Sequence, residues 1–413
     1  MLVHGIAHQA VVREKRDWRV ERADVVIAGG GLTGCLAAIV FSRRFPAHRI
    51  VLLDQFSNGS HQDPRGLALA LRTQQILTEF GVWQEALTHS AAIAHIHVSD
   101  ATGPGTMTMH AEREGLPALG YVAMAGTLQQ ELDRALEGIL SDRVQRLRGT
   151  QISSLKAEAD GYQLTLSSSD KNVPQTIHAG LLVVAEGSQS KTRDLLGINM
   201  ESHPYAQVAL AGIVEYADGH HQWAYERFTD HGPVALLPQG KKQAALVWCT
   251  SEQEAQRIQA LSADDQLRAL QHKVGAAPGR LQSVQLQGVF PLQLALAERF
   301  IGHRSVLIGN ACHTLHPVAG QGYNLGVRDI IDLVHHLDPN DLGGIDGLQH
   351  YRAQRLSDYQ EIVGLTHGLV HVFSNQNPIL RQARSKGLYT LRICDALSRP
   401  LMRKAMGFRA LIG

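Results

Sequence analysis

Closely spaced glycines near the N-terminus have the spacing of a phosphate-binding turn. They follow a short β-branched stretch (24–28) and precede an apolar stretch of helical length (32–44). In such a turn the first glycine permits the sharp bend, the second lets the backbone approach a pyrophosphate, and the third lets the helix pack closely on the strand. The start of the helix also presents free N–H groups and a positive dipole end to phosphates. The residues of this turn predicted to form the cofactor-binding site are Gly29, Gly31, Thr33 and Gly34.

A second apolar stretch, 49–53, ends in an acid, Asp54. A carboxylate at this place accepts hydrogen bonds from the hydroxyls of an adenosine ribose and repels a 2′-phosphate. Strand, glycine turn, helix, strand and acid within about 30 residues are the βαβ unit of a dinucleotide-binding domain. The pattern therefore predicts an adenine dinucleotide as ligand, and by itself it does not separate NAD from FAD.

Residues 309–324 form a second segment with binding chemistry, between a short apolar strand and a strongly helical stretch. Such a segment can direct backbone N–H groups and a helix dipole at a ligand with electron-rich oxygens. The alternative is a loop that merely enters a helix. The segment combines a polar side chain with a stiff turn and further glycines: Asn310, His316, Pro317, Gly320 and Gly322.

This segment resembles the second FAD-binding motif of the aromatic-ring flavoprotein monooxygenases, G-D-A-A-H-x-x-x-P-x-x-G-x-G-x-N. The match runs from Gly309 to Asn324, with Asn310 in place of the usual Asp and Cys312 in place of the second Ala. In that family the side chain at the Asp position binds the ribityl chain of FAD, and Asn can still donate and accept there. The resemblance implies that residues around Pro317 lie against the flavin ring. It also implies that the helix starting near Asn324 stabilises the negative charge of reduced flavin.

Two further motifs of the family are present, and the order of all four matches across residues 24–340. Glu186-Gly187 and Arg193 fit the motif D-G-x-x-S-x-x-R, which the family uses for FAD and NAD(P)H, with a longer acid at position 186. Arg65 matches an arginine that contacts FAD in relatives, although a loop arginine is more often a solvated charge. Met124-Ala125 departs from the polar pair that relatives often have, so a flavin contact is expected to be missing there.

Within this family the sequence most resembles the ubiquinone-pathway branch, that is, 2-octaprenyl-6-methoxyphenol hydroxylase and its paralogues. The resemblance is carried by the stretches 226–233, 246–248 and 314–329. The resemblance implies an FAD-dependent monooxygenase that takes electrons from NAD(P)H and hydroxylates the ring of a polyprenyl phenol with O2, through a flavin C4a-hydroperoxide. The protein would orient the ring, exclude water and stabilise the developing charge. His316 and Pro317 are the candidate catalytic residues, and a turn-stabilising role for His316 is an equal alternative.

Two other functions stay open from the sequence. One is a soluble hydroxylase of a small free phenol. The other is a non-catalytic component of a biosynthetic assembly that retains FAD structurally, an interpretation that the substitutions at Glu186 and Asn310 keep open.

The elements expected to position these residues give an α/β fold. It consists of a glutathione-reductase-like FAD-binding domain, an inserted, mostly antiparallel sheet domain for the substrate, and a C-terminal helical region. Helices are predicted at 32–44, 72–80, 127–140, 264–274 and 325–337, and strands at 24–28, 49–53, 95–98, 106–109, 151–155, 162–166, 181–185, 283–289 and 305–308. The expected domains are an N-terminal extension (1–23), the FAD-binding domain (24–94, 123–200 and 290–340), the substrate domain (95–122 and 201–289) and the C-terminal region (341–413).

Composition excludes several other classes of protein. With 413 residues, of which 44% are hydrophobic and 19% charged, the chain is neither disordered nor of low complexity. A net charge of +1 gives no bulk attraction to nucleic acid, and no nucleic-acid partner is expected. Four scattered cysteines without a C-x-x-C pair predict a reducing, cytoplasmic location. No metal site is expected either, because the helical pair His367 and His371 lacks an evident third ligand.

The C-terminal segment 375–413 departs from this neutrality, because it carries eight Lys or Arg and one acid. On a helix, most of the basic side chains share one stripe and apolar side chains lie broadly opposite. Such a segment either lies on an anionic membrane or packs its apolar side on the protein. A polyprenylated substrate favours peripheral contact with the inner face of a membrane.

Overall fold

The structure is a computed structural model that describes residues 21–57, 63, 65–84, 87, 90–168, 170, 173–315, 321–373, 387 and 390. Three of the predicted site residues, His316, Pro317 and Gly320, lie outside the described residues. So do most of the N-terminal extension and almost all of the basic segment 375–413.

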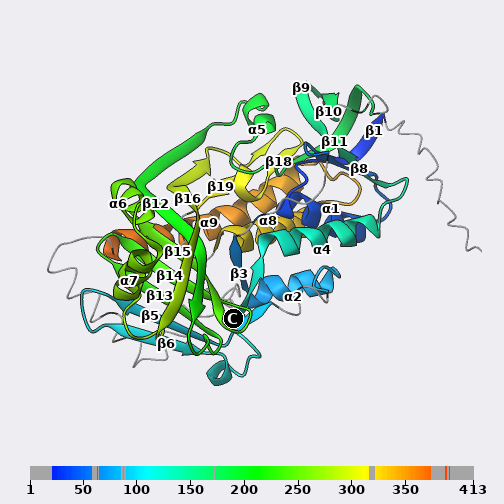
Figure 1. Cartoon of the computed structure of the whole chain (residues 1–413). Helices are drawn as coiled ribbons and strands as arrows, with labels where there is room; N and C mark the ends of the chain where they lie inside the picture. Colours follow the sequence, from blue (N-terminus) through cyan, green and yellow to red (C-terminus); the bar gives the residue numbers. More distant parts are fainter. Residues whose placement is uncertain are drawn as a thin grey trace, which may run out of the picture.

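A largely parallel sheet belongs to one half of the molecule and lies above α1 and α4 in the view of Figure 1. Its order is β17-β18-β11-β1-β2-β8, and β9 and β10 join it through antiparallel pairing with β11. Every residue of β2 is buried, as expected for a parallel strand covered on both faces. The strands are β1 (Arg22–Ala28), β2 (Ile50–Asp54), β8 (Val144–Arg148), β9 (Thr150–Glu158), β10 (Gly161–Ser168), β11 (Thr176–Val184), β17 (Ile301–Gly302) and β18 (Ser305–Leu307).

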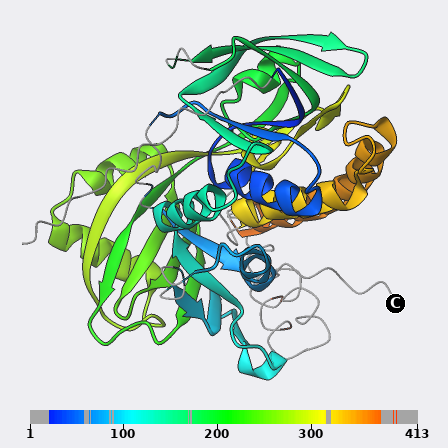
Figure 2. The same cartoon turned by 90° about the vertical axis from the view of Figure 1, so that its right-hand side faces the viewer.

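Three helices pack side by side against this sheet: α1 (Leu32–Arg44), α4 (Ala125–Glu137) and α8 (Gln321–His336) (Figure 2). The middle one, α1, contacts both of the others. A long helix, α9 (Ile345–Phe373), packs along α8. None of the described helices combines the length and the apolar character needed to cross a lipid bilayer.

The second large sheet has the order β19-β16-β12-β15-β14-β13-β5-β6. All neighbouring strands in it are antiparallel except β13 and β5, which confirms the prediction of a mostly antiparallel sheet. Helices α6 (Glu252–Gln259) and α7 (Ala263–Val274) cover one face, where Ile258 and Leu270 share a buried cluster with the sheet. The strands are β5 (His95–Asp100), β6 (Thr106–His110), β12 (Met200–Tyr216), β13 (Trp223–Thr229), β14 (Gly232–Gln239), β15 (Gln243–Thr250), β16 (Leu281–Ala297) and β19 (His313–Thr314).

A three-stranded sheet connects the two halves. It contains β3 (Gly66–Ala70), β7 (Gly120–Met124) and β4 (Ala91–Ile93), and α2 (Leu71–Glu79) continues from β3. Contact with the large sheet is tight, since a Cβ on Gly66 would lie only 2.7 Å from the Cβ of Ala245 in β15. The small sheet therefore sets how the substrate half approaches the FAD half.

The predicted α/β architecture is confirmed, and most predicted helices and strands are found with shifted ends. Helix 32–44 has the predicted bounds. The helix expected at 325–337 begins four residues earlier, at Gln321, so Asn324 lies inside its first turn. The strand expected at 283–289 is the middle of the 17-residue strand β16. The predicted domain boundaries stay a prediction.

Candidate active site

The first glycine turn has the geometry that its three predicted roles require. Gly29 has φ +115°, a region that side chains rarely adopt, and a Cβ there would lie 2.5 Å from the oxygen of Ala185. A Cβ on Gly34 would lie 1.8 Å from the oxygen of Gly29, so only glycine lets α1 approach the turn. No atom lies within 4 Å of a Cβ position on Gly31, and no side chain caps the start of α1 there. The turn thus leaves open space in front of unpaired helix N–H groups, which suits an anionic phosphate.

Asp54 lies at this turn, but it is held in a buried ion pair that the sequence does not predict. Its Oδ2 is 2.7 Å from Arg146 of β8, and its Oδ1 accepts a hydrogen bond from the backbone N–H of Phe56. Arg146 also contacts Asp133 of α4 at 2.8 Å. A Cβ on Gly30 would lie 2.2 Å from Cγ of Asp54, so the carboxylate packs directly on the turn. Contact between Asp54 and a ribose stays a proposal, and Arg146 is the unpredicted group that would orient the carboxylate.

Polar side chains from α1 and α4 extend this network to the backbone of the turn. Gln129 donates to Asp133 at 3.0 Å and to the oxygen of Gly30 at 3.3 Å. The Cys35 thiol donates to the same oxygen at 3.1 Å. Burial raises the pKa of Cys35 to about 12, so the group stays a neutral donor at physiological pH. A buried hydrogen-bond network from α1 and α4 therefore holds the backbone of the glycine turn in place.

The second glycine segment meets the first at Thr33, one of the predicted cofactor-binding residues. Gly309 has φ +59°, and a Cβ on it would lie 2.9 Å from Oγ1 of Thr33. Gly326 of α8 also packs closely here, because its Cβ would lie 3.3 Å from Cα of Gly309. Asn310 is exposed next to this contact, and no atom lies within 4 Å of a Cβ position on Gly322. The two motifs predicted to bind one cofactor thus converge on one place, between the starts of α1 and α8.

A fully buried carboxylate, Asp329 of α8, holds the second segment. Its Oδ2 accepts the backbone N–H of Gly309 at 2.8 Å and lies 3.0 Å from Nε2 of His313. Its Oδ1 accepts from Nε of Arg355 at 2.9 Å and from the Tyr359 hydroxyl at 2.7 Å, both in α9. Burial alone would raise the pKa of Asp329, but Arg355 and His313 outweigh that effect and the pKa is lowered. Asp329 and Arg355 were missed by the sequence analysis, although an Asp among the apolar residues of a predicted helix is a usable signal.

Asn324, predicted to bind cofactor, is buried and directs its side chain to β3. Its Oδ1 accepts from the N–H of Ala70, and its Nδ2 donates to the oxygen of Ala68, both at 2.9 Å. The amide therefore fixes α8 to the strand that follows Arg65. A cofactor contact at this position stays a proposal.

The segment at 186–193 is linked to the second glycine segment by Arg193. The longer arm of Glu186 folds back, and its carboxylate accepts hydrogen bonds from the hydroxyls of Ser190 and Thr192 at 2.7 and 2.8 Å. Gly187 has φ +83°, with no atom within 4 Å of a Cβ position. Arg193 is buried and donates to the oxygen of Ala311 at 3.4 Å. Glu186 therefore stabilises its own loop, whereas Arg193 joins the loop to the neighbouring motif.

Arg65 lies where the small sheet meets the substrate half. Its side chain is 54% exposed and forms an ion pair with Asp63 at 2.6 Å. Its guanidinium also lies 6.0 Å from the ring centre of Phe290 in β16. The arginine is thus close to the predicted cofactor path and to the predicted substrate sheet.

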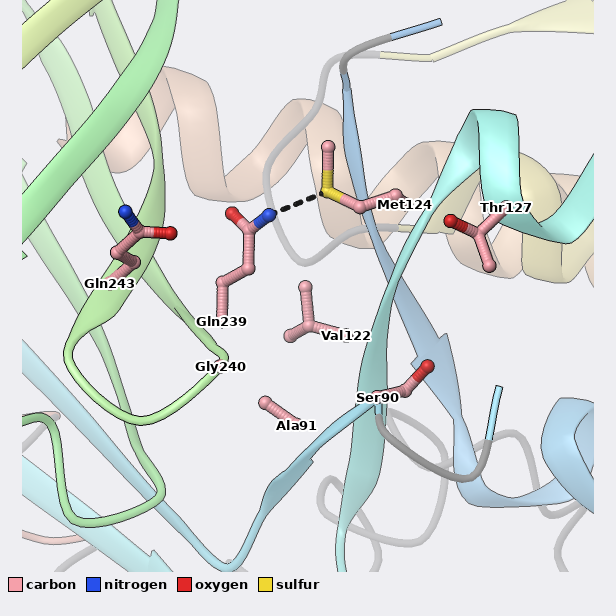
Figure 3. A pocket seen from close by; sticks show the side chains of 8 residues that line it. All are labelled: Ser90, Ala91, Val122, Met124, Thr127, Gln239, Gly240 and Gln243. Atoms are coloured by element: carbon pink, nitrogen blue, oxygen red, sulfur yellow. Dashed lines mark hydrogen bonds between the residues drawn. The ribbon is translucent and has the colours of Figure 1, made fainter. Parts of the chain in front are cut away.

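A pocket of about 240 Å³ opens between β7 and the β14–β15 turn (Figure 3). Met124, the position that departs from the relatives, lines it, and its sulfur accepts a hydrogen bond from Gln239 at 2.9 Å. Met124 pairs with Gly66 across β3 and β7, so this pocket lies beside the start of β3. Its lining residues are Ser90, Ala91, Val122, Met124, Thr127, Gln239, Gly240 and Gln243.

Among the described residues, one group of side chains has ligand atoms close enough for a metal ion. Glu158, Asp160 and His178 bring these atoms within 4.8 Å of one another, where the turn between β9 and β10 lies beside β11. Asp160 already forms an ion pair with Arg22 at 2.6 Å, so the guanidinium group supplies a positive charge at this place.

Two converging glycine segments at two helix starts define a flavoprotein that binds FAD through a glutathione-reductase-like domain. The FAD binding domain family matches residues 22–365, and the chain belongs to this family as an FAD-dependent monooxygenase.

Comparisons with individual proteins agree with this assignment. The chain is 31% identical over 394 residues to ubiquinone hydroxylase UbiL of Rhodospirillum rubrum, covering 93% of this chain and 90% of that protein. It is 28% identical to 3-demethoxyubiquinol 3-hydroxylase of Escherichia coli, covering 93% and 98% of the two chains. The crystal structure of p-nitrophenol 4-monooxygenase PnpA from Pseudomonas putida superposes with a TM-score of 0.75 over 95% of this chain and all of that chain. Its 16% identity makes this a likeness of fold alone.

Proposed function

We propose that this FAD-dependent monooxygenase hydroxylates the aromatic ring of a polyprenyl phenol in ubiquinone biosynthesis, with NAD(P)H and O2 as co-substrates. One observation carries the proposal. Both FAD motifs converge at Thr33 in a chain that resembles a ubiquinone hydroxylase over 93% of its length. The relatives are named as a ubiquinone hydroxylase and a 3-demethoxyubiquinol 3-hydroxylase, which supports the same class of substrate here.

The chain's own groups have distinct tasks in this proposal. The uncapped start of α1 behind Gly31 binds the pyrophosphate, and Asp54, oriented by Arg146, accepts from the adenosine ribose. Asn310 is exposed at the place where a ribityl chain would pass, and Arg193 holds the neighbouring loop. When bound, FAD supplies the activation of O2 with electrons from NAD(P)H. His316 and Pro317 stay candidate catalytic residues outside the described part of the chain.

The substrate half offers an apolar surface to the ring and its prenyl tail. Phe290 of β16 is 41% exposed beside Arg65. Ala211 of β12 and Val247 of β15 pair directly on the same face. An apolar surface favours a prenylated ring over a small charged phenol and excludes water from the reacting atoms.

Complementation tests the proposed function. Bacterial strains that each lack one ring-hydroxylation step are supplied with this chain, and their quinone intermediates are identified by mass. We expect the chain to restore ubiquinone in one strain and to remove the intermediate that accumulates there. Failure in every strain, with the protein present and carrying FAD, would contradict the assignment to this pathway.

A peripheral membrane contact through residues 375–413 is the second part of this proposal. The excess of basic residues in that segment and the prenylated substrate support it. The full chain should sediment with vesicles containing anionic phosphatidylglycerol at low salt and be released at about 0.5 M salt, where surface charges are screened. Equal binding to neutral vesicles would argue against it, as would unchanged binding after the segment is deleted.

A further inference from the structure

One face of the large antiparallel sheet is apolar across four neighbouring strands. Cross-strand pairing places Ala211, Val247 and Ala235 in one row, because directly paired residues project to the same face. The neighbouring rows of the same strands are also apolar or carry neutral side chains: Ile213, Ala245, Leu237 and Ala224 on one side, and Ala209, Cys249, Pro233 and Phe228 on the other.

This face looks towards the FAD half. Ala245 lies under Gly66 of β3, and Leu237 belongs to a cluster with Val122 of β7. The opposite face carries Leu246 and Leu236, which pack under α6 and α7. The apolar rows are therefore on the side of the sheet where a substrate would meet the flavin.

Glu226 interrupts the apolar surface. It pairs with Ala235 in β13 and β14, which adds it to the row of Val247. Its neighbours confirm the direction, because Arg227 donates to the oxygen of Val274 in α7 on the opposite face. The Glu226 charge also adds to burial in raising the pKa of Cys249, which lies on the face towards the FAD half. Among the residues of these three rows in β12 to β15, Glu226 carries the only charged side chain.

The position of Glu226 suits a ring held between the sheet and the flavin. Glu226 lies two strand spacings from β15, with β14 between them, and Ala245 under Gly66 is two residues along β15 from the row of Glu226. Strand spacing of about 4.8 Å and a rise of about 3.4 Å per residue give about 12 Å between the backbones of Glu226 and Ala245. That separation accommodates one substituted phenol ring and the glutamate side chain.

We propose that Glu226 binds the phenol hydroxyl of the substrate and acts as its general base, an inference that rests on the proposed function. In the bound state the carboxylate accepts a hydrogen bond from the phenol O–H. The ring carbon gains its new C–O bond from the activated oxygen that bound FAD and O2 supply, and the O–O bond of that oxidant breaks. At the same time the phenol O–H bond breaks and the proton moves to the carboxylate, so the oxygen lone pair feeds the ring. The ring regains aromaticity when the hydroxylated carbon loses its proton to the oxygen left by the O–O cleavage, and the carboxyl group returns its own proton to the phenol oxygen. The glutamate ends the cycle ionised.

Binding without turnover is the first test. The absorbance of enzyme-bound FAD is titrated with a short-chain prenyl phenol and with its methyl ether, which has no hydroxyl to donate. A hydrogen bond to a charged group is worth about 1.5 to 3 kcal/mol, so the wild type should prefer the phenol by about 10- to 100-fold. Glu226→Gln should reduce this preference to a few-fold and leave affinity for the ether unchanged. An unreduced preference in Glu226→Gln would overturn the proposal.

Turnover is the second test. General base catalysis contributes about 10² to 10⁴-fold, so Glu226→Gln should lower kcat by about 100-fold or more and remove the acidic limb of the pH profile. Glu226→Asp keeps the carboxylate and should retain the limb with an intermediate kcat. Wild-type kcat together with an unchanged acidic limb in Glu226→Gln would refute the base role.

Controls separate this inference from the proposed function. Glu254→Gln removes a half-buried acid that pairs with Arg257 on α6, behind the same sheet, and should change neither binding nor kcat. If the wild type hydroxylates no polyprenyl phenol, the proposed function fails, while the binding titration still decides whether Glu226 contacts a phenol. If the wild type is active and Glu226→Gln matches it in both tests, only the role of Glu226 fails.

Discussion

Asp329→Asn is the sharpest test of how the FAD site is held. The substitution keeps the shape of the side chain and removes its charge, while Arg355 stays fully buried beside it. Removing one partner of a buried ion pair typically costs about 3 to 5 kcal/mol. Arg355 retains Asp332 and Asp358 as partners, so we expect the lower end, about 3 kcal/mol in the free energy of unfolding. Urea unfolding followed by tryptophan fluorescence measures it.

Cofactor binding should fall as well, because the N–H of Gly309 shares its acceptor oxygen with His313. An amide in place of Asp329 can accept at only one of its two ends. We expect FAD affinity, measured by flavin fluorescence during reconstitution, to drop at least tenfold. Asp218→Asn, in an exposed turn, is the matched control and should change neither quantity.

The contribution of Asp329 to the free energy of unfolding should also depend on pH. Because the pKa of Asp329 is lowered in the folded state, its contribution is fully present above the ordinary pKa of an Asp and is lost as the pH falls through the lowered value. The difference in unfolding free energy between wild type and Asp329→Asn should therefore shrink on acidification. If the variant unfolds within about 1 kcal/mol of wild type at neutral pH and keeps its FAD, the reasoning from buried charge is wrong.

Three further results are expected from the first glycine turn. Arg146→Met should weaken FAD binding at least tenfold and lower stability, because it leaves the buried Asp54 without its cation; equal FAD titrations for variant and wild type would contradict this. Gly34→Ala should prevent folding, whereas Gly31→Ala should fold with unchanged circular dichroism and lose FAD affinity, since only Gly31 faces open space. Cys35, with its pKa raised to about 12, should resist iodoacetamide at pH 8 until the chain is unfolded, as mass spectrometry of the labelled peptide would show.

The parts of the fold that sequence reasoning predicts are those set by local pattern. The helix 32–44 has the predicted bounds because its apolar run is confined by a glycine turn and by Pro46. The acid that closes β2 was likewise found from its place at the end of an apolar run. The need for glycine at positions 29 and 34 is predicted by the same local pattern, the glycine turn.

What the sequence could not predict depends on contacts between distant segments. Arg146 and Asp54 are 92 positions apart, and no periodicity relates them. Glu226 lies in β13, whose burial does not alternate cleanly between its two faces, so alternation alone does not tell which face meets the FAD half. Only the pairing of β13 with β14, together with the contact between Gly66 and Ala245, decides it.

The two buried charge networks answer the same physical problem. A glycine has no side chain of its own to anchor it, and Gly30 and Gly309 both lie in segments predicted to bind the cofactor. Hydrogen bonds to the backbone can fix them, and here they come from buried groups: Cys35 and Gln129 reach the oxygen of Gly30, and Asp329 reaches the N–H of Gly309. Apolar residues in place of these groups could match or exceed their contribution to stability, but they would give no direction to a glycine backbone. Buried polar groups therefore lie beneath each FAD motif because a glycine loop needs an oriented partner.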